Sequence, residues 1–518
     1  MKLGTLIESL PIELVCGNLD EDVAEIVFDS RKAGSNALFV ALPSSSARGI
    51  EGHMFIEDAW GRGCRSFLVS SVPEGLAGRE GANVLHTKNT RHGLALISQR
   101  FFGEPDKRLK MIGLTGTNGK TTISYMLKYI LEKAGKKVGL IGSNGIIYPG
   151  FYEKLLNTTP ESSLLYGYLN GMADDGVEYC ILEATSQGFM HNRTDGIVFD
   201  AALFTNITPD HISQTEHTDF EHYLECKKLI FKQSNVCFVN RDAGKFDDIV
   251  AGVPSKIIRL YGLSHEDGGK RASGEGELAY TASDIRFNRH GNRMAIDFAC
   301  KAPDWKRELR VNIPGLYNVE NALGAICIAD HFGIDADDIA AGLDEAQCAG
   351  RMEYVDTPAP YTIIIDFAHN EDGVRTMMEA AKAYNPKRIL CVYGLQGDRA
   401  HIRRSGCGKI LGETADYMIL SDACPKTDDP DQVLDDLAAG VEAGGGAGRY
   451  EIIRDRNISI PKILDMAEEG DIVLLSGRGN TLYEEVFDEL IPLDEREVVR
   501  KYFEDKAAAK GNTTGAGK

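Results

Sequence analysis

The chain has 518 residues, which is too long for a single hydrophobic core and predicts three or four domains of ordinary size. Hydrophobic residues make up 43% and charged residues 26%, as in ordinary soluble globular proteins, and the net charge of −20 argues against nucleic acid or an anionic membrane as the main partner. Eleven scattered cysteines favour reduced thiols, and no apolar run reaches membrane-spanning length, so we expect a cytoplasmic protein. We also expect the protein to be a monomer.

Residues 1–108 are predicted to form a first α/β domain. Short apolar strands are expected at Ala37–Leu42, Ser66–Val69 and Asn83–His86, with a helix near Thr90–Phe102. The segment Gly103-Glu104-Pro105-Asp106 is typical of a linker and separates this domain from the next.

Residues 109–348 are predicted to form a central domain. A strand over Leu109–Leu114 leads through a glycine-rich turn into a helix over Thr121–Ala134. Later strands are expected at Val138–Ile141, Tyr179–Glu183, Ala201–Asn206 and Val236–Asn240, with helices at Ser162–Ala173 and Phe220–Gln233. This alternation predicts a parallel sheet with helices on both faces.

Residues 349–518 repeat the alternation and predict a second doubly wound domain of the dinucleotide-fold type. Its strands are expected at Thr362–Asp366, Arg388–Tyr393, Tyr417–Leu420 and Asp471–Ser476. Glycines at Gly440–Gly448 predict a loop, and the tail from about residue 507 is predicted to be disordered. The expected fold class is therefore α/β with three domains.

The stretch from Gly113 to Thr122 carries the strongest chemical signal. It reads Gly-Leu-Thr-Gly-Thr-Asn-Gly-Lys-Thr-Thr between a strand and a helix, although Leu114 stands where a strict Walker motif has glycine. The backbone N–H groups of Gly116 to Gly119 can donate to phosphate oxygens. Lys120 can then contact the β- and γ-phosphates, and the Thr121 hydroxyl can bind Mg²⁺. The pattern predicts ATP binding; the alternative is a glycine-rich turn without a ligand.

Polar residues follow two strands of the predicted central sheet. Glu183 ends one strand, and His211 follows another within Phe204-Thr-Asn-Ile-Thr-Pro-Asp-His211. The carboxyl ends of parallel strands line the ligand crevice, so Glu183 is a candidate oxygen ligand for Mg²⁺ and His211 a candidate ligand or orienting group. The alternative is that each is a capped or salt-bridged turn residue.

Lys227 lies on the apolar face of a predicted amphipathic helix, four residues from Tyr223 and from Phe231. A buried ammonium group is costly unless it is neutralised or paired. The pattern by itself favours a lysine that reaches solvent or Glu183.

The order of these motifs resembles the Mur ligase family, and within it the MurE branch, which adds the third residue of the peptidoglycan stem peptide. The resemblance spans nearly the whole chain. It rests on Gly116-Thr-Asn-Gly-Lys-Thr-Thr122, Asn157-Thr-Thr-Pro160, the Glu183 strand end, the His211 motif and Tyr223-x-x-x-Lys227-x-x-x-Phe231, then on Gly315-Leu-Tyr-Asn-Val-Glu-Asn321, Gly350-Arg-Met-Glu353, Asp366-Phe-Ala-His369 and Gly397-Asp-Arg399.

The resemblance implies roles for residues around ATP and Mg²⁺. Lys227 matches a carbamylated lysine that acts as an anionic metal ligand, together with Thr121, Glu183 and His211. The implied catalytic set is Lys120, Glu183, His211, Lys227 and Arg351. The implied ATP contacts are Gly116, Thr117, Asn118, Gly119, Lys120, Thr121, Thr122, Asn321 at adenine, Arg351 at the γ-phosphate and Asp366 at the ribose.

The resemblance also implies the substrates. Ser30 matches a uridine-site position, and Arg399 the α-carboxylate site of the incoming amino acid. Positions that hold the muramoyl dipeptide are matched by Asn157, Thr158, Thr159, Thr185, His191 and Arg193. The implied reaction is ATP-dependent addition of an amino acid to UDP-N-acetylmuramoyl-L-alanyl-D-glutamate through an acyl phosphate.

Two stretches depart from relatives that add meso-diaminopimelate. Ala423-Cys-Pro-Lys426 stands in place of Asp-Asn-Pro-Arg, and Gly477-Arg-Gly-Asn-Thr481 in place of Gly-Lys-Gly-His-Glu. The Lys426 side chain cannot make the two parallel hydrogen bonds that an arginine makes with a carboxylate, so we expect diaminopimelate to be disfavoured as the incoming amino acid. We expect lysine or another diamino acid to be added instead. The alternatives are a sister ligase acting on another carboxylate and an inactive nucleotide-binding partner protein.

Overall fold

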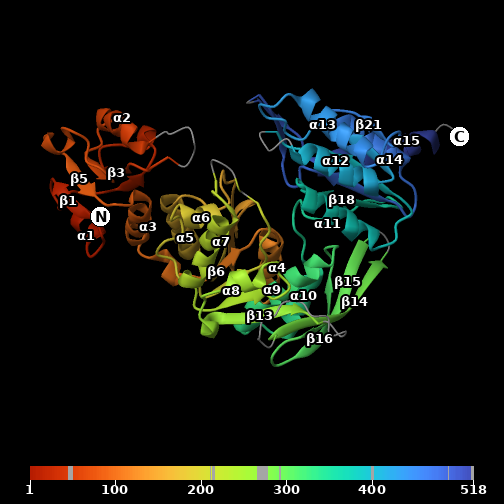
Figure 1. Cartoon of the computed structure of the whole chain (residues 1–518), viewed down its shortest axis with the longest axis horizontal. Coiled ribbons are helices and arrows are strands. Elements are labelled where there is room, and N and C mark those ends of the chain that lie inside the picture. Colours follow the sequence, from red (N-terminus) through yellow and green to blue (C-terminus); the bar gives the residue numbers. More distant parts are fainter. Residues whose placement is uncertain are drawn as a thin grey trace. The chain divides into compact units, whose positions relative to one another are not determined.

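The computed structural model describes residues 1–44, 51–210, 212, 216–264, 278–290, 293–397, 402–487 and 489–514. The chain folds into two compact units. Unit 1 comprises Met1–Thr281 and Leu323–Ile339, and unit 2 comprises Ala282–Ala322 and Ala340–Lys518. Figure 1 shows the elements coloured along the sequence.

The N-terminal part of unit 1 contains a five-stranded sheet in the order β1-β5-β4-β3-β2, in which only β1 runs antiparallel to its neighbour. Its strands are β1 Glu13–Cys16, β2 Glu25–Val27, β3 Ala37–Val40, β4 Ser66–Val69 and β5 Asn83–His86, and its helices are α1 Leu3–Ile7, α2 Ile56–Gly61 and α3 Thr90–Phe101. The strands and helix expected in this part are confirmed.

The largest sheet has the order β16-β15-β14-β13-β12-β11-β6-β10-β7-β8-β9 (Figure 1). Strands β7, β10, β6, β11, β12 and β13 are parallel, as predicted. Its strands are β6 Lys110–Thr115, β7 Val138–Gly142, β8 Gly145–Tyr148, β9 Phe151–Glu153, β10 Tyr179–Glu183, β11 Ala201–Phe204, β12 Cys237–Asn240, β13 Ile258–Leu263, β14 Tyr280–His290, β15 Arg293–Lys301 and β16 Lys306–Val311.

The helices that alternate with these strands are α4 Lys120–Lys133, α5 Ser162–Asp174, α6 Ser186–Met190, α7 Phe220–Lys228, α8 Phe246–Val250, α9 Tyr317–His331 and α10 Ala336–Glu345. The prediction of a purely parallel sheet omitted the antiparallel strands at both edges, β8 with β9 and β15 with β16. Along Lys306–Val311 the apolar residues Leu309 and Val311 alternate with charged ones, which is the sequence signal of such an edge strand, and only these two side chains of the strand are buried.

The six-stranded sheet of unit 2 has the order β17-β18-β22-β19-β20-β21, with β17 antiparallel and the others parallel, and β23 pairs with β24 as a separate hairpin. The strands are β17 Glu353–Tyr354, β18 Thr362–Asp366, β19 Ile389–Tyr393, β20 Tyr417–Leu420, β21 Tyr450–Ile452, β22 Ile472–Ser476, β23 Tyr483–Val486 and β24 Glu489–Pro492. The helices are α11 Glu371–Lys382, α12 Ile402–Thr414, α13 Pro430–Ala443, α14 Arg456–Met466 and α15 Glu495–Thr514.

One local prediction in unit 2 is correct only in part, and another is wrong. Of the loop expected at Gly440–Gly448, residues 444–448 lie beyond α13 as predicted, but the helix includes Gly440. Glycine there allows close packing of α12 on α13, since a Cβ at Gly440 would lie 2.2 Å from the carbonyl oxygen of Ser405. Helix α15 runs to Thr514, so the tail expected to be disordered from residue 507 continues an anchored helix through an alanine-rich stretch.

The domain boundaries near 108 and 348 remain predictions, because the two compact units divide the chain elsewhere. The three larger sheets occupy residues 13–86, 110–311 and 353–476. Among the described residues, no helix combines the length and the apolar character needed to cross a membrane.

Candidate functional site

The glycine-rich turn lies between β6 and α4 in unit 1. Gly116 has φ +138° and Gly119, at the start of α4, has φ +90°, a region that favours glycine. A Cβ at Gly116 would lie only 1.9 Å from Oγ1 of Thr205. The ammonium group of Lys120 donates to the carbonyl oxygens of Gly116 (2.8 Å) and Thr117 (3.1 Å), so it lies over the turn.

The segment after β11 holds the turn in shape. The backbone N–H of Thr117 donates to the carbonyl oxygen of Asn206 (3.0 Å), and that of Asn118 to the Asn206 side chain (2.9 Å). The Thr205 hydroxyl donates to the carbonyl oxygen of Asn118 (2.7 Å). The sequence marked Thr205 and Asn206 only as part of a resemblance; the structure shows that they fix the phosphate-loop backbone.

Glu183 is fully buried at the end of β10. Its carboxylate accepts hydrogen bonds from the hydroxyl groups of Thr121 (3.0 Å) and Ser143 (3.1 Å) and from the N–H of Ser143 (3.2 Å). Gly142 leaves room for it, since a Cβ there would lie 2.2 Å from Oε1. A buried carboxylate beside a threonine hydroxyl suits a hard cation such as Mg²⁺. Sequence reasoning missed Ser143, which follows β7 without any motif of its own.

Lys227 lies on α7 and is 2% exposed. Its Nζ donates to the carbonyl oxygen of Gly116 (2.8 Å) and lies 4.7 Å from the centre of the Tyr223 ring. Burial, and then the charge of Lys120, hold the pKa of Lys227 well below its usual value. The expectation that this side chain reaches solvent or Glu183 is wrong, because α7 packs it against the phosphate loop. A neutral amine is the form that reacts with CO₂ to give a carbamate.

The structure brings together part of the predicted metal set. Thr121 contacts Glu183 directly, and Lys227 contacts the phosphate loop that precedes Thr121. Thr122 is buried in the first turn of α4. His211, the fourth predicted ligand, and Arg399 lie outside the described residues.

Three of the predicted dipeptide-binding residues, Thr158, Thr159 and Thr185, lie near the end of β10. The Thr159 hydroxyl donates to the carbonyl oxygen of Glu183 (2.8 Å) and lies 3.0 Å from the Thr185 hydroxyl, while Thr158 reaches Ser143 (3.2 Å). Asn157 is exposed. Ser30, the predicted uridine-site residue, is buried in the N-terminal part of the unit.

Arg193 and His191 lie in a cluster of charges. The Arg193 guanidinium pairs with Glu161 (2.7 Å), which also pairs with Arg91 on α3 (3.1 Å). Burial, and then the charges of Arg91 and Arg193, lower the pKa of His191 to about 4. His191 is therefore neutral at pH 7, and its role as a substrate contact remains a prediction.

Unit 2 holds the other predicted nucleotide contacts. The Asp366 carboxylate accepts from the N–H groups of Met352 (2.7 Å) and Ala368 (2.8 Å), and burial raises its pKa. The Arg351 guanidinium lies 4.6 Å from the centre of the Phe367 ring. Asn321 on α9 is buried and donates to Asn318 (2.8 Å).

Two stretches, Ala423–Lys426 and Gly477–Thr481, differ from the relatives that add diaminopimelate, and both lie beside the β23–β24 hairpin. Arg478 is fully buried and donates to the carbonyl oxygen of Tyr483 (3.0 Å), and its guanidinium pairs with Glu484 (3.3 Å). The backbone N–H of Lys426 donates to the carbonyl oxygen of Glu485 (2.9 Å). Arg478 therefore packs the hairpin onto the rest of unit 2, and Lys426 joins the hairpin through its backbone.

Comparisons with known proteins assign the middle and the C-terminal part of the chain to the same family. Residues 114–329 match the Mur ligase middle domain, and residues 350–479 match the Mur ligase glutamate ligase domain. The UDP-N-acetylmuramoyl-L-alanyl-D-glutamate–2,6-diaminopimelate ligase of Clostridium perfringens (strain 13 / Type A) is 34% identical over 508 residues, 98% of this chain and 100% of the relative.

Solved structures show the same fold. One described as a UDP-N-acetylmuramoyl-L-alanyl-D-glutamate–2,6-diaminopimelate ligase has a TM-score of 0.69 and 24% identity, over 98% of this chain and 99% of that chain. The MurF ligase of Thermotoga maritima in complex with ADP has a TM-score of 0.59 and 18% identity, over 94% and 98%. These similarities confirm the α/β fold class with three domains.

The names of the relatives conflict with one expectation from the sequence. They specify 2,6-diaminopimelate, which contradicts the expectation that this amino acid is disfavoured and that lysine is preferred. That expectation rested on Lys426, which lacks the bidentate fork of an arginine, and on the difference at Gly477–Thr481, so it used two short stretches whereas the relatives match along nearly the whole chain. With both domain models matched and relatives above 30% identity along nearly its whole length, the chain belongs to the Mur ligase family and is a ligase.

Proposed function

We propose that the chain uses ATP to join an amino acid, 2,6-diaminopimelate, to the D-glutamate carboxylate of UDP-N-acetylmuramoyl-L-alanyl-D-glutamate. The observation that carries the proposal is the contact between the phosphate-loop residue Thr121 and the buried Glu183 (3.0 Å). This contact puts two oxygen ligands suited to a hard cation next to a nucleotide loop. The names of the relatives support the choice of substrates.

The residues of the loop would carry the phosphoryl-transfer step. Lys120 would turn from the loop carbonyls to the β- and γ-phosphates, and Arg351 would neutralise the γ-phosphate, so the D-glutamate carboxylate can attack it and form an acyl phosphate. The amine of the incoming amino acid would then displace phosphate and form the amide. Mg²⁺ held by Thr121, Glu183, His211 and carbamylated Lys227 would offset phosphate charge.

The test incubates purified protein with ATP, Mg²⁺, the muramoyl dipeptide and, separately, diaminopimelate, lysine and ornithine, and follows phosphate release and product mass. We expect product with diaminopimelate, and none from Lys120→Met. Lys128→Met is the matched control, because Lys128 lies on the same helix and pairs with Glu132 (2.8 Å).

Each other outcome changes the proposal in a defined way. Product with another amino acid alone would keep the ligase and replace its amino acid. Phosphate release with a different carboxylate acceptor alone would favour a sister ligase. ATP binding without product from any acceptor would favour an inactive nucleotide-binding partner.

A further inference from the structure

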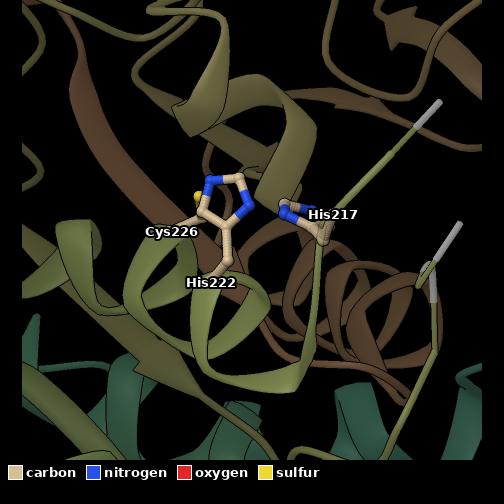
Figure 2. A group of neighbouring side chains, drawn as sticks. All are labelled: His217, His222 and Cys226. Carbon is tan, nitrogen blue, oxygen red and sulfur yellow. The ribbon is translucent and has the colours of Figure 1, made fainter. Parts of the chain in front are cut away.

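Three soft metal-ligand side chains converge at the start of α7, outside the set assigned to ATP and Mg²⁺. They are His217, His222 and Cys226, and one ligand atom from each lies within 4.8 Å of the other two. Figure 2 shows the His222 ring between the Cys226 sulfur and the His217 ring. We call these three residues the His-His-Cys cluster.

Local structure explains why the three side chains meet. His222 and Cys226 are four residues apart on α7 and therefore share one face of the helix. The Asp219 side chain caps the helix by accepting from the N–H of His222 (2.8 Å), so the chain turns and brings His217 back over the first turn.

The His217 ring is held in one orientation. One of its ring nitrogens, Nε2, lies 2.9 Å from the Ser186 hydroxyl on α6, and its ring meets those of His222 and Tyr223 edge-on at centroid distances of 5.0 and 5.1 Å. A metal would then use Nδ1, in the common arrangement in which a second hydrogen bond orients a metal-bound imidazole.

Burial favours a site rather than a surface group of histidines. His217 is fully buried and Cys226 is 7% exposed, whereas His222 is only partly buried. Two imidazoles and one thiolate suit Zn²⁺ or a similar transition metal, not Mg²⁺. The partly exposed side leaves the fourth position to water.

We propose that His217, His222 and Cys226 bind one Zn²⁺-like ion at the start of α7. A tetrahedral zinc would hold these ligand atoms roughly 3.3–3.6 Å apart, so closure needs side-chain movements of about 1 Å. Binding replaces the thiol proton of Cys226 with the metal and releases that proton to solvent. Because Lys227 follows Cys226 directly, the ion would also fix the part of α7 that presents Lys227 to the phosphate loop.

The test uses the full-length protein without a histidine tag, stripped of metal with a chelator and then titrated with Co²⁺. We expect one equivalent to bind and to give a thiolate-to-cobalt absorption band, which one equivalent of Zn²⁺ removes. Cys226→Ser should lose the band, and His222→Asn should weaken binding at least about tenfold. Cys16→Ser is the control, since this half-buried thiol lies on β1 and should leave the band unchanged.

A second readout guards against variants that fail to fold. Zn²⁺ should raise the unfolding temperature of the wild-type protein and of Cys16→Ser, but not of Cys226→Ser, when all are compared with their own metal-free forms. The proposal is overturned if Co²⁺ gives no thiolate band, or if Cys226→Ser binds Co²⁺ and responds to Zn²⁺ as the wild type does.

Discussion

At the scale of single residues, the position of Lys227 is the most informative. Its amine is buried beside the phosphate loop with a pKa well below the usual value, which is the state that carbamylation requires. A carbamate would convert a costly buried ammonium group into an oxygen ligand.

Lys227→Ala should therefore lower the rate of phosphate release at least about 100-fold, the scale of removing one preorganised electrostatic group. Acetate should restore part of the activity by supplying the missing carboxylate. Lys228→Ala is the control, because the neighbouring lysine pairs with Glu225 (2.8 Å) on the helix. Full activity of Lys227→Ala would remove the carbamate from the proposal.

Ser143 supports Glu183 with both its N–H and its hydroxyl group. Ser143→Ala should raise the Mg²⁺ concentration needed for half-maximal phosphate release about tenfold, as loss of an outer contact to a metal ligand usually does. The KM for ATP should change little. Ser234→Ala, which removes a hydroxyl bonded to the Ile230 carbonyl, should leave the Mg²⁺ dependence alone, and an unchanged dependence in Ser143→Ala would argue against metal at Glu183.

His191 predicts a pH effect on stability. Its pKa is about 4 in the folded chain and about 6.5 when unfolded, so its contribution is present above pH 6.5 and is lost as the pH falls towards 4. Between pH 7.5 and pH 5 this amounts to about 2 kcal/mol. Urea unfolding should show a smaller loss over this interval for His191→Gln than for the wild type; equal losses would mean that His191 is not desolvated.

At the scale of elements, Glu161, which precedes α5, ties α3 to the turn after α6 through Arg91 and Arg193. Glu161→Gln would leave two buried guanidinium groups without their carboxylate, which should lower the free energy of unfolding by about 3 kcal/mol. Urea titration measures this. Glu132→Gln, which breaks the more exposed pair with Lys128, should cost less than about 1 kcal/mol, and similar losses in both variants would contradict the assigned network.

The elements also show where sequence patterns are reliable. Apolar runs such as Ile389–Tyr393 and Ile472–Ser476 are strands, because continuous burial in a parallel sheet demands such runs. Gly440 misled the prediction, since its small size serves helix packing rather than a loop. That use of glycine depends on α12, a partner that a local pattern does not contain.

At the scale of the whole molecule, the predicted ATP contacts are divided between the two units. Thr121 and Lys120 belong to unit 1, and Arg351 and Asp366 belong to unit 2. A substitution of a residue that contacts the nucleotide should weaken nucleotide binding, whichever unit holds that residue.

Mg²⁺ and ATP at about 100 times the Kd should raise the free energy of unfolding by about 2.7 kcal/mol. Thermal unfolding with and without nucleotide should show a reduced shift for Lys120→Met and also for Arg351→Met. Arg375→Met, at an exposed position on α11, is the control. A full shift in Arg351→Met would show that this arginine does not contact ATP.

Local patterns were enough to predict the phosphate loop, the alternation of strands and helices, and the family, because glycines, a lysine and apolar runs act through neighbours along the chain. Only the folded chain shows that Ser143 supports Glu183, that Lys227 is desolvated against Gly116, and that Arg478 is buried under the hairpin. Burial and hydrogen-bond partners come from segments that are distant in sequence, so no local pattern contains them. The His-His-Cys cluster lies between these cases: its spacing on α7 is local, but the return of His217 over the helix exists only in the fold.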